Sequence, residues 1–241
     1  MKQIFKGILI SLLATSFLFS NDLLLQVDKN LQPGSSESYK KLINIEPDGS
    51  KKEFLLYQAK SGTNKMVSSF LKPESEKGRN TLRLDDNMWL YMPEVGRAIR
   101  ITSMQSVVGG VFNNSDIMRI DFSSEYAVES SKEEKDEFIL ILKAKNDTIA
   151  YDKLIMSVDK KTITPKKIDC YSSTEMLIKT LFYKDIKDFG NGIIRPSVIE
   201  TKSPFYRGYK SIMVYGKITP KKFNDEAFTI DNINKVNDLR R

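Results

Sequence analysis

The chain of 241 residues contains no histidine and only one cysteine, Cys170. Without histidine, neither Ser-His-Asp and Cys-His catalytic arrangements nor the usual zinc sites can form. Cys170 has no partner for an intrachain disulfide and no histidine to activate it, so we interpret it as a half-buried strand residue. The sequence therefore predicts a protein that is not an enzyme and that needs no metal or other cofactor.

Motifs that hold phosphate or calcium are also missing. No GxGxxG or P-loop pattern occurs, and the pair Gly109-Gly110 alone indicates a hinge or loop. The segment from Asp231 to Asn234 lacks the alternating oxygen ligands and the central glycine of a calcium loop. Asp85 and Asp86 precede an asparagine between two apolar runs, so we interpret them as turn residues and not as paired catalytic carboxylates.

The charge of the chain is only mildly positive, at +7. Without the two lysines of residues 1–20, the remaining 36 basic and 31 acidic residues give a net charge of +5. The bases are interspersed with acids and no concentrated basic face is visible, so we expect no nucleic-acid partner. The lysine pairs at 160–161, 166–167 and 221–222 indicate solvated turn or edge-strand charges, or attraction to anionic phospholipid.

Long hydrophobic runs are limited to residues 8–19, which are too short to span a membrane comfortably. Lys2 and Lys6 precede this run, and Ser20 follows it, which is typical of a secretory signal peptide over residues 1–20. Cleavage after Ser16 is an alternative to cleavage after Ser20, and an uncleaved anchor is a further one. No cysteine lies nearby for lipid attachment, so we expect residues 21–241 to be exported without a lipid anchor, as one domain.

The remaining chain reads as short strands separated by turns. Residues 22–31 are spaced as one face of a short helix that Pro33-Gly34 ends. Residues 123–136 are polar and acidic with room for a short helix, and residues 223–236 suggest a closing strand or short helix. The strand candidates are residues 39–45, 53–59, 65–71, 79–84, 88–92, 97–104, 137–144, 151–158, 165–171, 177–185, 194–201 and 209–218. This spacing predicts a mainly β domain, an antiparallel sandwich or barrel.

Several of these strands are apolar on both faces, as in residues 54–57, 88–92, 138–142 and 212–215. A sheet with one wet face alternates polar and apolar residues, so both faces must be covered. Two packed sheets or outer helices would explain this, and so would a curved sheet whose concave face is an apolar cavity. In the second case, the N-terminal helix and residues 107–121 would form the lid, and the nine methionines would give the cavity adaptable walls.

Residues 79–117 carry a resemblance to a known family. The matching positions are Trp89-x-Tyr91-x-Pro93, Arg97, Arg100, Gly110-x-Phe112 and Ser115-Asp116. This pattern is similar to the core of the outer-membrane lipoprotein-sorting proteins, relatives of the periplasmic carriers LolA and LolB. The chain departs from the family at two places. Ile101-Thr102 stand where family members more often continue a basic run, and residues 117–119 stand where family members tend to have aromatic or acidic residues.

The resemblance implies a half-open antiparallel β-barrel of about eleven strands with an N-terminal helix and short lid helices. It also implies a monomeric periplasmic carrier that binds acyl chains of lipoproteins or other lipids, with an inner-membrane transporter as a further partner. The alternative is an accessory or sensor domain of the same fold that binds an exporter or an envelope-stress membrane protein. Catalysis by carboxylates or tyrosine ranks third.

The candidate ligand contacts are the apolar residues of the central stretch and its neighbours. Because side chains of a strand alternate, only one of the two sets within residues 88–92 can face inward. The residues expected at the acyl cavity or lid are Met66, Met88, Trp89, Leu90, Tyr91, Met92, Ile99, Ile101 and Phe112. The residues expected to donate hydrogen bonds to lid carbonyls or to a polar lipid head group are Arg79, Arg97 and Arg100, of which Arg97 and Arg100 lie on opposite faces of one strand.

Overall fold

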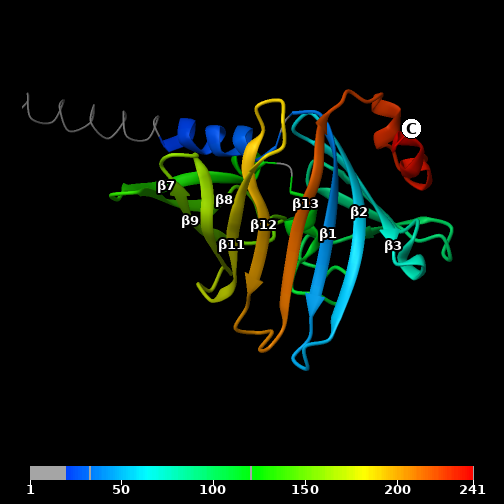
Figure 1. The fold of residues 1–241 in the computed structure, drawn as a ribbon, viewed down its shortest axis with the longest axis horizontal. Coiled ribbons are helices and arrows are strands. Elements are labelled where there is room, and N and C mark those ends of the chain that lie inside the picture. Colours follow the sequence, from blue (N-terminus) through cyan, green and yellow to red (C-terminus); the bar gives the residue numbers. More distant parts are fainter. Residues whose placement is uncertain (1–19, 33, 120, 241) are drawn as a thin grey trace, which may run out of the picture.

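The computed structural model describes residues 20–32, 34–119 and 121–240, and its main feature is one antiparallel sheet of 13 strands (Figure 1). The strands are β1 (Ser36–Ile45), β2 (Lys51–Ser61), β3 (Lys65–Lys72), β4 (Asn80–Leu84), β5 (Asn87–Tyr91), β6 (Ala98–Ile101), β7 (Tyr126–Glu133), β8 (Glu137–Ala144), β9 (Lys153–Asp159), β10 (Thr164–Tyr171), β11 (Leu177–Asp188), β12 (Ile194–Lys202) and β13 (Lys210–Pro220). The helical elements are α2 (Asn114–Ile117), α3 (Phe122–Glu125), the 3-10 turns η1 (Glu74–Glu76), η2 (Asp225–Phe228) and η3 (Ile233–Arg240), and a helix over residues 20–31.

The order of strands in the sheet explains how its ends are connected. From β1 the chain runs outward strand by strand to the edge strand β6, and it re-enters at the opposite edge, β7. It then returns strand by strand to β13, which pairs with β1. Residues 102–125 therefore lead from one edge of the sheet to the other, and we call them the crossing segment.

One hydrophobic cluster fills the concave side of the sheet. Leu42 and Leu56 from the middle strands share it with Leu140 and Met156 from the β7 end, so the sheet curves around a common core. The N-terminal helix supplies Leu23, Leu24, Val27 and Leu31, and the crossing segment supplies Val107, Phe112, Ile117 and Phe122. These two segments cover the concave face.

The convex side is covered only in part. Tyr57, Val67 and Leu82 face outward from β2–β4 and are buried by Phe228, Ile233 and Val236 of the C-terminal segment. Figure 1 shows the N-terminal helix beside β7–β9 and the C-terminal turns at the other end of the sheet, near β2 and β3. The apolar strands β2 and β5 thus have a cover on each face, whereas Ile139 and Ile141 on the outer face of β8 remain half-exposed. The expectation that both faces are covered therefore holds for only part of the sheet.

The predicted mainly β fold and the predicted turns are confirmed. The β4–β5 turn at Asp85-Asp86 places Asp85 at φ 50, a conformation that Asp tolerates well. Asn113 caps α2 and exchanges hydrogen bonds with Asp116 in a capping box. The helix begins at Asn114, directly after this cap.

Three details of the sequence prediction need correction. The sheet has 13 strands instead of about eleven, and it is not closed into a barrel. The polar stretch 123–136 holds the end of the expected short helix, α3, but continues as β7, an edge strand whose many charged and polar residues hide the alternation of Tyr126 and Val128 toward the core. Of the two alternatives for residues 223–236, the short helix is confirmed, as the 3-10 helices η2 and η3.

The predicted signal peptide lies outside the described residues, except for Ser20, which is helical. Within the described residues, no helix has the length and apolar character needed to cross a membrane.

Candidate functional site

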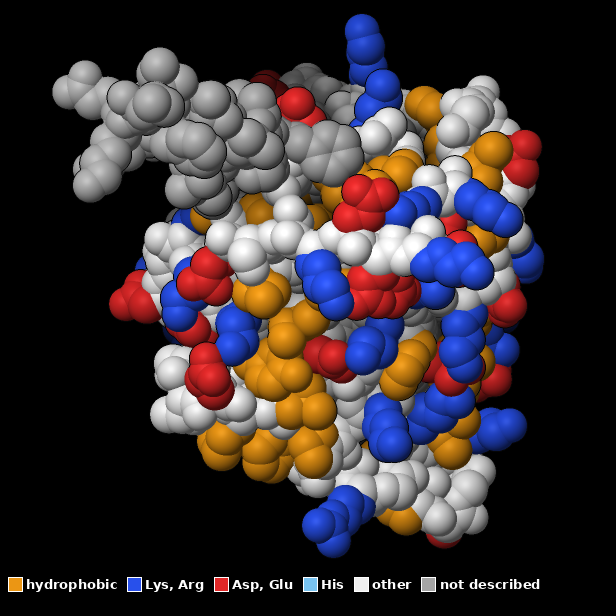
Figure 2. All heavy atoms as spheres, turned by 90° about the vertical axis from the view of Figure 1, so that its left-hand side faces the viewer, with side chains coloured by type: hydrophobic (Ala, Val, Ile, Leu, Met, Phe, Trp, Pro, Cys, Tyr) orange, Lys and Arg blue, Asp and Glu red, His pale blue; other side chains and the backbone are white. Residues whose placement is uncertain are grey.

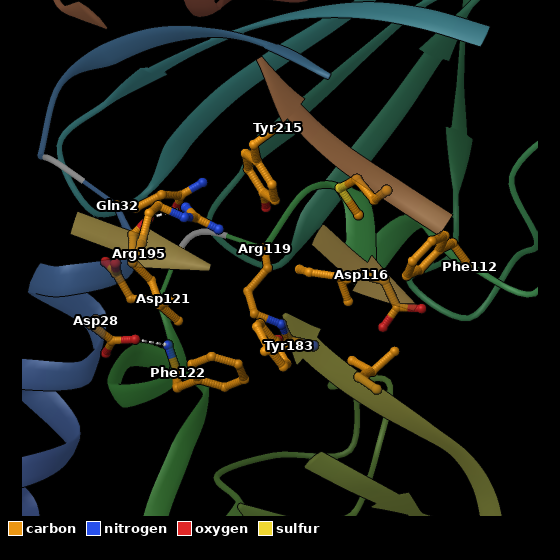
Figure 3. Close-up of a pocket in the computed structure, with 14 residues that line it drawn as sticks. Asp28, Gln32, Phe112, Asp116, Arg119, Asp121, Phe122, Tyr183, Arg195 and Tyr215 are labelled. Carbon is orange, nitrogen blue, oxygen red and sulfur yellow. Dashed lines mark hydrogen bonds between the residues drawn. The ribbon is translucent and has the colours of Figure 1, made fainter. Parts of the chain in front are cut away.

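The concave face encloses a small cavity of about 40 Å³ beneath the N-terminal helix and the crossing segment (Figure 3). Its apolar wall includes Phe112, Leu181, Ile199 and Met213. Pockets that bury small organic ligands usually have volumes of about 300–1,000 Å³. An acyl chain therefore fits only if one of the two covering segments moves away.

Charged side chains share this cavity with the apolar ones. Arg119 projects into its centre, Arg195 lies across the cavity from Phe112, and Tyr215 lies above Arg119 between them (Figure 3). Asp28, Asp116 and Asp121 complete the polar part of the wall. Charged groups therefore occur along the whole cavity, from Asp28 and Asp121 near the N-terminal helix to Asp116 beside Phe112 (Figure 3).

Buried ion pairs attach the crossing segment to the sheet. Lys179 Nζ of β11 lies 2.9 Å from Asp116 Oδ2, and Lys60 Nζ of β2 lies 3.1 Å from Asp121 Oδ1. The side chains of the first pair are 5% and 1% exposed. Buried pairs of this kind are costly to break one partner at a time, because the other charge remains without compensation.

A third ionic contact involves two arginines. Arg83 Nη2 lies 2.6 Å from Glu125 Oε1, and Arg119 Nη1 lies 2.6 Å from Glu125 Oε2. Burial alone would lower the pKa of Arg119, but the carboxylate of Glu125 holds it well above its usual value. Arg83 comes from β4 and Glu125 from the residue before β7, so this contact brings together residues from opposite ends of the strand order.

Side-chain donors of the sheet also reach backbone carbonyls of the crossing segment. Gln58 Nε2 donates to the Ile117 carbonyl at 2.9 Å, and Arg83 Nη1 donates to the Met118 carbonyl at 3.0 Å. Lys40 Nζ lies 3.5 Å from the Ile117 carbonyl. Further bonds join Lys179 Nζ to the Val111 carbonyl and Asn44 Nδ2 to the Val108 carbonyl. The segment is thus held by many polar contacts and by apolar side chains in the main core and in the cluster around Met118.

The N-terminal helix is linked to the crossing segment through Asp28. Its two carboxylate oxygens accept hydrogen bonds from the backbone N–H groups of Phe122 (2.7 Å) and Ser123 (2.8 Å). Burial raises the pKa of Asp28, although these hydrogen bonds oppose the shift. Displacement of the helix would break both bonds, so the two covers are coupled.

Lys40, Arg195 and Tyr215 form a separate group on neighbouring strands. Lys40 Nζ lies 4.6 Å from the centre of the Tyr215 ring, and Arg195 Cζ lies 3.9 Å from it. Burial lowers the pKa of Lys40. Burial alone would raise the pKa of the Tyr215 hydroxyl, but the two cations lower it to about 8.

The structure brings most of the apolar residues singled out in the sequence to the concave side. Met66 and Met88 form a small buried cluster with Met118 of the crossing segment, and Ile101 packs against it. Leu90 shares the face of Met88, opposite Ile99 of the edge strand. Phe112 is fully buried and lines the cavity. These positions agree with a contact role, which remains a prediction.

Trp89 and Tyr91 lie on the other face of β5 and pack in the convex cluster with the C-terminal segment. Met92 follows the strand and is half-buried in a turn. The register of β5 places Met88 and Leu90 on the concave face, so the alternate residues Trp89 and Tyr91 must face the convex side.

Among the described residues, the three arginines singled out in the sequence form no hydrogen bond with the crossing segment. Arg79 pairs with Glu76 at 3.1 Å, Arg97 is exposed, and Arg100 donates to Asn87 on the convex side. The hydrogen bonds expected of them come from Lys40, Gln58 and Arg83 instead. The sequence did not indicate that Lys40, Gln58 and Arg83 are the donors, because a buried lysine and a surface lysine within a strand cannot be distinguished from the sequence pattern.

Cys170 is buried in the main core and not half-buried, and burial raises the pKa of its thiol. Groups of three or more side chains suited to bind a metal are absent from the described residues.

Comparison with known proteins adds the family. A family model described as an uncharacterized protein matches residues 62–235, more than half of the chain. The chain belongs to this family. Among curated proteins none matches it.

Solved structures give the fold. A LolA superfamily protein from Nitrosomonas europaea matches with a TM-score of 0.79 and 24% identity, covering 88% of this chain and 98% of that one. A domain assigned to outer membrane lipoprotein sorting from Vibrio parahaemolyticus has a TM-score of 0.76 and 16% identity, covering 89% and 98%. A DUF1329 family protein from Desulfovibrio piger has a TM-score of 0.76 and 20% identity, covering 90% and 99%. The resemblance drawn from the sequence is confirmed: the fold is that of the LolA superfamily.

Proposed function

We propose that this protein is a periplasmic carrier that shields the acyl chains of a lipoprotein or another lipid during transfer between membranes. The observation that carries the proposal is the closed concave face, whose apolar wall is covered by two segments that lie outside the sheet. The LolA-like fold, which a lipoprotein-sorting domain shares, supports it.

The mechanism is physical and not covalent. Each methylene group that leaves water for an apolar site contributes about 0.8 kcal/mol. In the closed form the covers occupy this surface themselves, so the acyl chain and the covers compete for it. A carrier needs such competition, because closure of the covers helps to expel the chain to an acceptor.

Native mass spectrometry with a lipopeptide and a phospholipid tests the proposal directly. The discriminating variants are Leu181→Asp and Phe182→Asp, neighbours on β11. Leu181 lines the cavity, whereas Phe182 is half-buried on the outer face. We expect Leu181→Asp to abolish acyl binding and Phe182→Asp to preserve it.

Circular dichroism and thermal unfolding report whether each variant folds, and Leu181→Thr serves as a milder change at the same position. A wild-type protein that stays free of lipid after incubation with both ligands would refute the carrier. Equal binding by the two aspartate variants would show that the ligand lies elsewhere.

A second candidate function is contact with a membrane protein. Ile139, Ile141 and Ile155 lie on the outer face of β8 and β9, are half-exposed and join none of the buried clusters of the described chain. On the side of the molecule that carries β7–β9, hydrophobic side chains gather in a band bordered by Lys and Arg (Figure 2). Crosslinking to an envelope protein through this face, without lipid binding, would favour this function.

A further inference from the structure

The buried charges of the concave face do not balance. Six cations are buried there, and four carboxylates face them in the described part of the chain. They are Lys40, Lys60, Arg83, Arg119, Lys179 and Arg195 against Asp28, Asp116, Asp121 and Glu125. The interior therefore has an excess of positive charge.

The excess is located at Lys40 and Arg195. Lys60, Arg83, Arg119 and Lys179 all have carboxylate partners at 2.6–3.1 Å. Lys40 and Arg195 are each 2% exposed, and neither forms an ion pair with a described residue. Isolated buried cations are unfavourable, so an empty protein gains no stability from their charge.

The present partners of these two cations are Tyr215, one carbonyl of the sheet and carbonyls of the covering segments. Lys40 Nζ is 3.5 Å from the Ile117 carbonyl of the crossing segment. Arg195 Nη1 donates to the Leu31 carbonyl at the end of the N-terminal helix, and its Nε donates to the neighbouring Pro196 carbonyl at 3.2 Å. When the covers move, Lys40 loses its carbonyl and Arg195 loses that of Leu31.

The same movement exposes an apolar surface beside the cations. Arg195 and Tyr215 line the central cavity together with Leu181, Ile199 and Met213. The two residues also line a second, smaller cavity on their other side. In Figure 3 Arg195 lies at one end of the cavity and Phe112 at the other, with Tyr215 between them. A ligand with an anionic group beside Arg195 and Tyr215 and a chain along Leu181, Ile199 and Met213 matches this lining.

We propose that Lys40, Arg195 and Tyr215 form the binding site for the anionic head group, a phosphate or carboxylate, of an acylated ligand. Its chain lies along the apolar wall, and its anionic oxygens replace the carbonyls of Ile117 and Leu31. Hydrogen bonds from a guanidinium or an ammonium to an anionic oxygen are stronger than those from the same groups to a neutral carbonyl. The inference rests on the proposed function as a carrier and narrows its ligand to an anionic amphiphile.

The test compares two probes that differ only in the head group, lysophosphatidate and the neutral monoacylglycerol with the same acyl chain. Isothermal titration with the wild-type protein is expected to give about tenfold to hundredfold tighter binding of lysophosphatidate, the range of a hydrogen bond to a charged group. The Lys40→Met variant should reduce this ratio toward one. The matched control is Lys41→Met, the next residue on β1, whose side chain is 46% exposed and pairs with Glu53 on the other face.

Thermal unfolding separates a binding role from a structural one. Lys40→Met removes an uncompensated buried charge, so the midpoint of the empty protein should stay constant or rise. Arg195→Gln is the second variant and should also reduce the ratio. A fall in the midpoint of Lys40→Met as large as that of Lys179→Met would show that the fold needs Lys40, and would overturn the proposal.

The remaining outcomes are distinct. Equal affinity of the wild-type protein for both probes, or an unchanged ratio in Lys40→Met, would overturn the head-group site while the carrier stands. If neither probe binds, the proposed function fails. If inorganic phosphate alone raises the unfolding midpoint and displaces lysophosphatidate, the site binds a free anion and not a lipid head group.

Discussion

The contact between Lys179 and Asp116 offers the sharpest test of how the crossing segment is held. Replacement of Lys179 by Met leaves the carboxylate of Asp116 buried at 1% exposure and without its cation. Removal of one partner from a buried pair typically costs about 3–5 kcal/mol of unfolding free energy. Asp116 keeps hydrogen bonds from the Tyr151 hydroxyl (2.9 Å) and the Asn113 N–H (3.0 Å), so we expect the lower end, about 3 kcal/mol.

The double variant Lys179→Met/Asp116→Asn separates the pair from its surroundings. Its amide oxygen can still accept hydrogen bonds while no charge remains, so the free energy of unfolding should lie within about 1 kcal/mol of the wild type or exceed it. Urea unfolding followed by circular dichroism measures these values. Hydrogen exchange should accelerate over residues 111–119 in the single variant.

Lys41→Met is the control for an exposed pair. Its contact with Glu53 spans 2.7 Å with both side chains about half exposed, so the cost should stay below about 1 kcal/mol. A loss below about 1 kcal/mol for Lys179→Met as well would refute the reasoning, because it would mean that water reaches the Asp116 carboxylate.

Two further predictions concern the crossing segment and the cationic group. A Cβ at Gly110 would lie 2.2 Å from Asn44 Oδ1, so Gly110→Ala should displace the crossing segment and lower the unfolding free energy by about 1–3 kcal/mol. The control is Gly34→Ala, whose Cβ would have no atom within 4 Å, and it should leave the unfolding free energy unchanged. Equal unfolding free energies of the two variants would refute the clash. Absorbance at 295 nm should show one buried tyrosine, Tyr215, ionising near pH 8, and Lys40→Met should move this step to higher pH because it removes one of the two cations. Because the pKa of Tyr215 is lower in the folded protein, its ionisation should contribute to stability at about pH 10, and this contribution should be lost as the pH falls toward 8. An absorbance titration without a step below about pH 9.5 would contradict this.

The sequence alone determined the local structure of this protein. Turn residues such as Asp48-Gly49 and Asp85-Asp86 separate the strands where the structure has its turns, because these residues favour turns wherever they occur. Asn113 caps the start of a short helix for a similarly local reason, because asparagine is favoured at helix N-caps. The apolar double-faced strands predicted covers on both sides, which β2 and β5 have, and the family motif indicated the LolA-like fold.

Tertiary structure alone decided which residues face the interior. Trp89 and Met88 are equally apolar neighbours, and only the register of β5 sends the tryptophan outward and the methionine inward. Lys40 and Arg195 are about 155 positions apart, yet the pairing of β13 with both β1 and β12 brings them to one tyrosine. Charge–charge and cation–ring contacts of this kind depend on distances in space, which local sequence patterns do not encode.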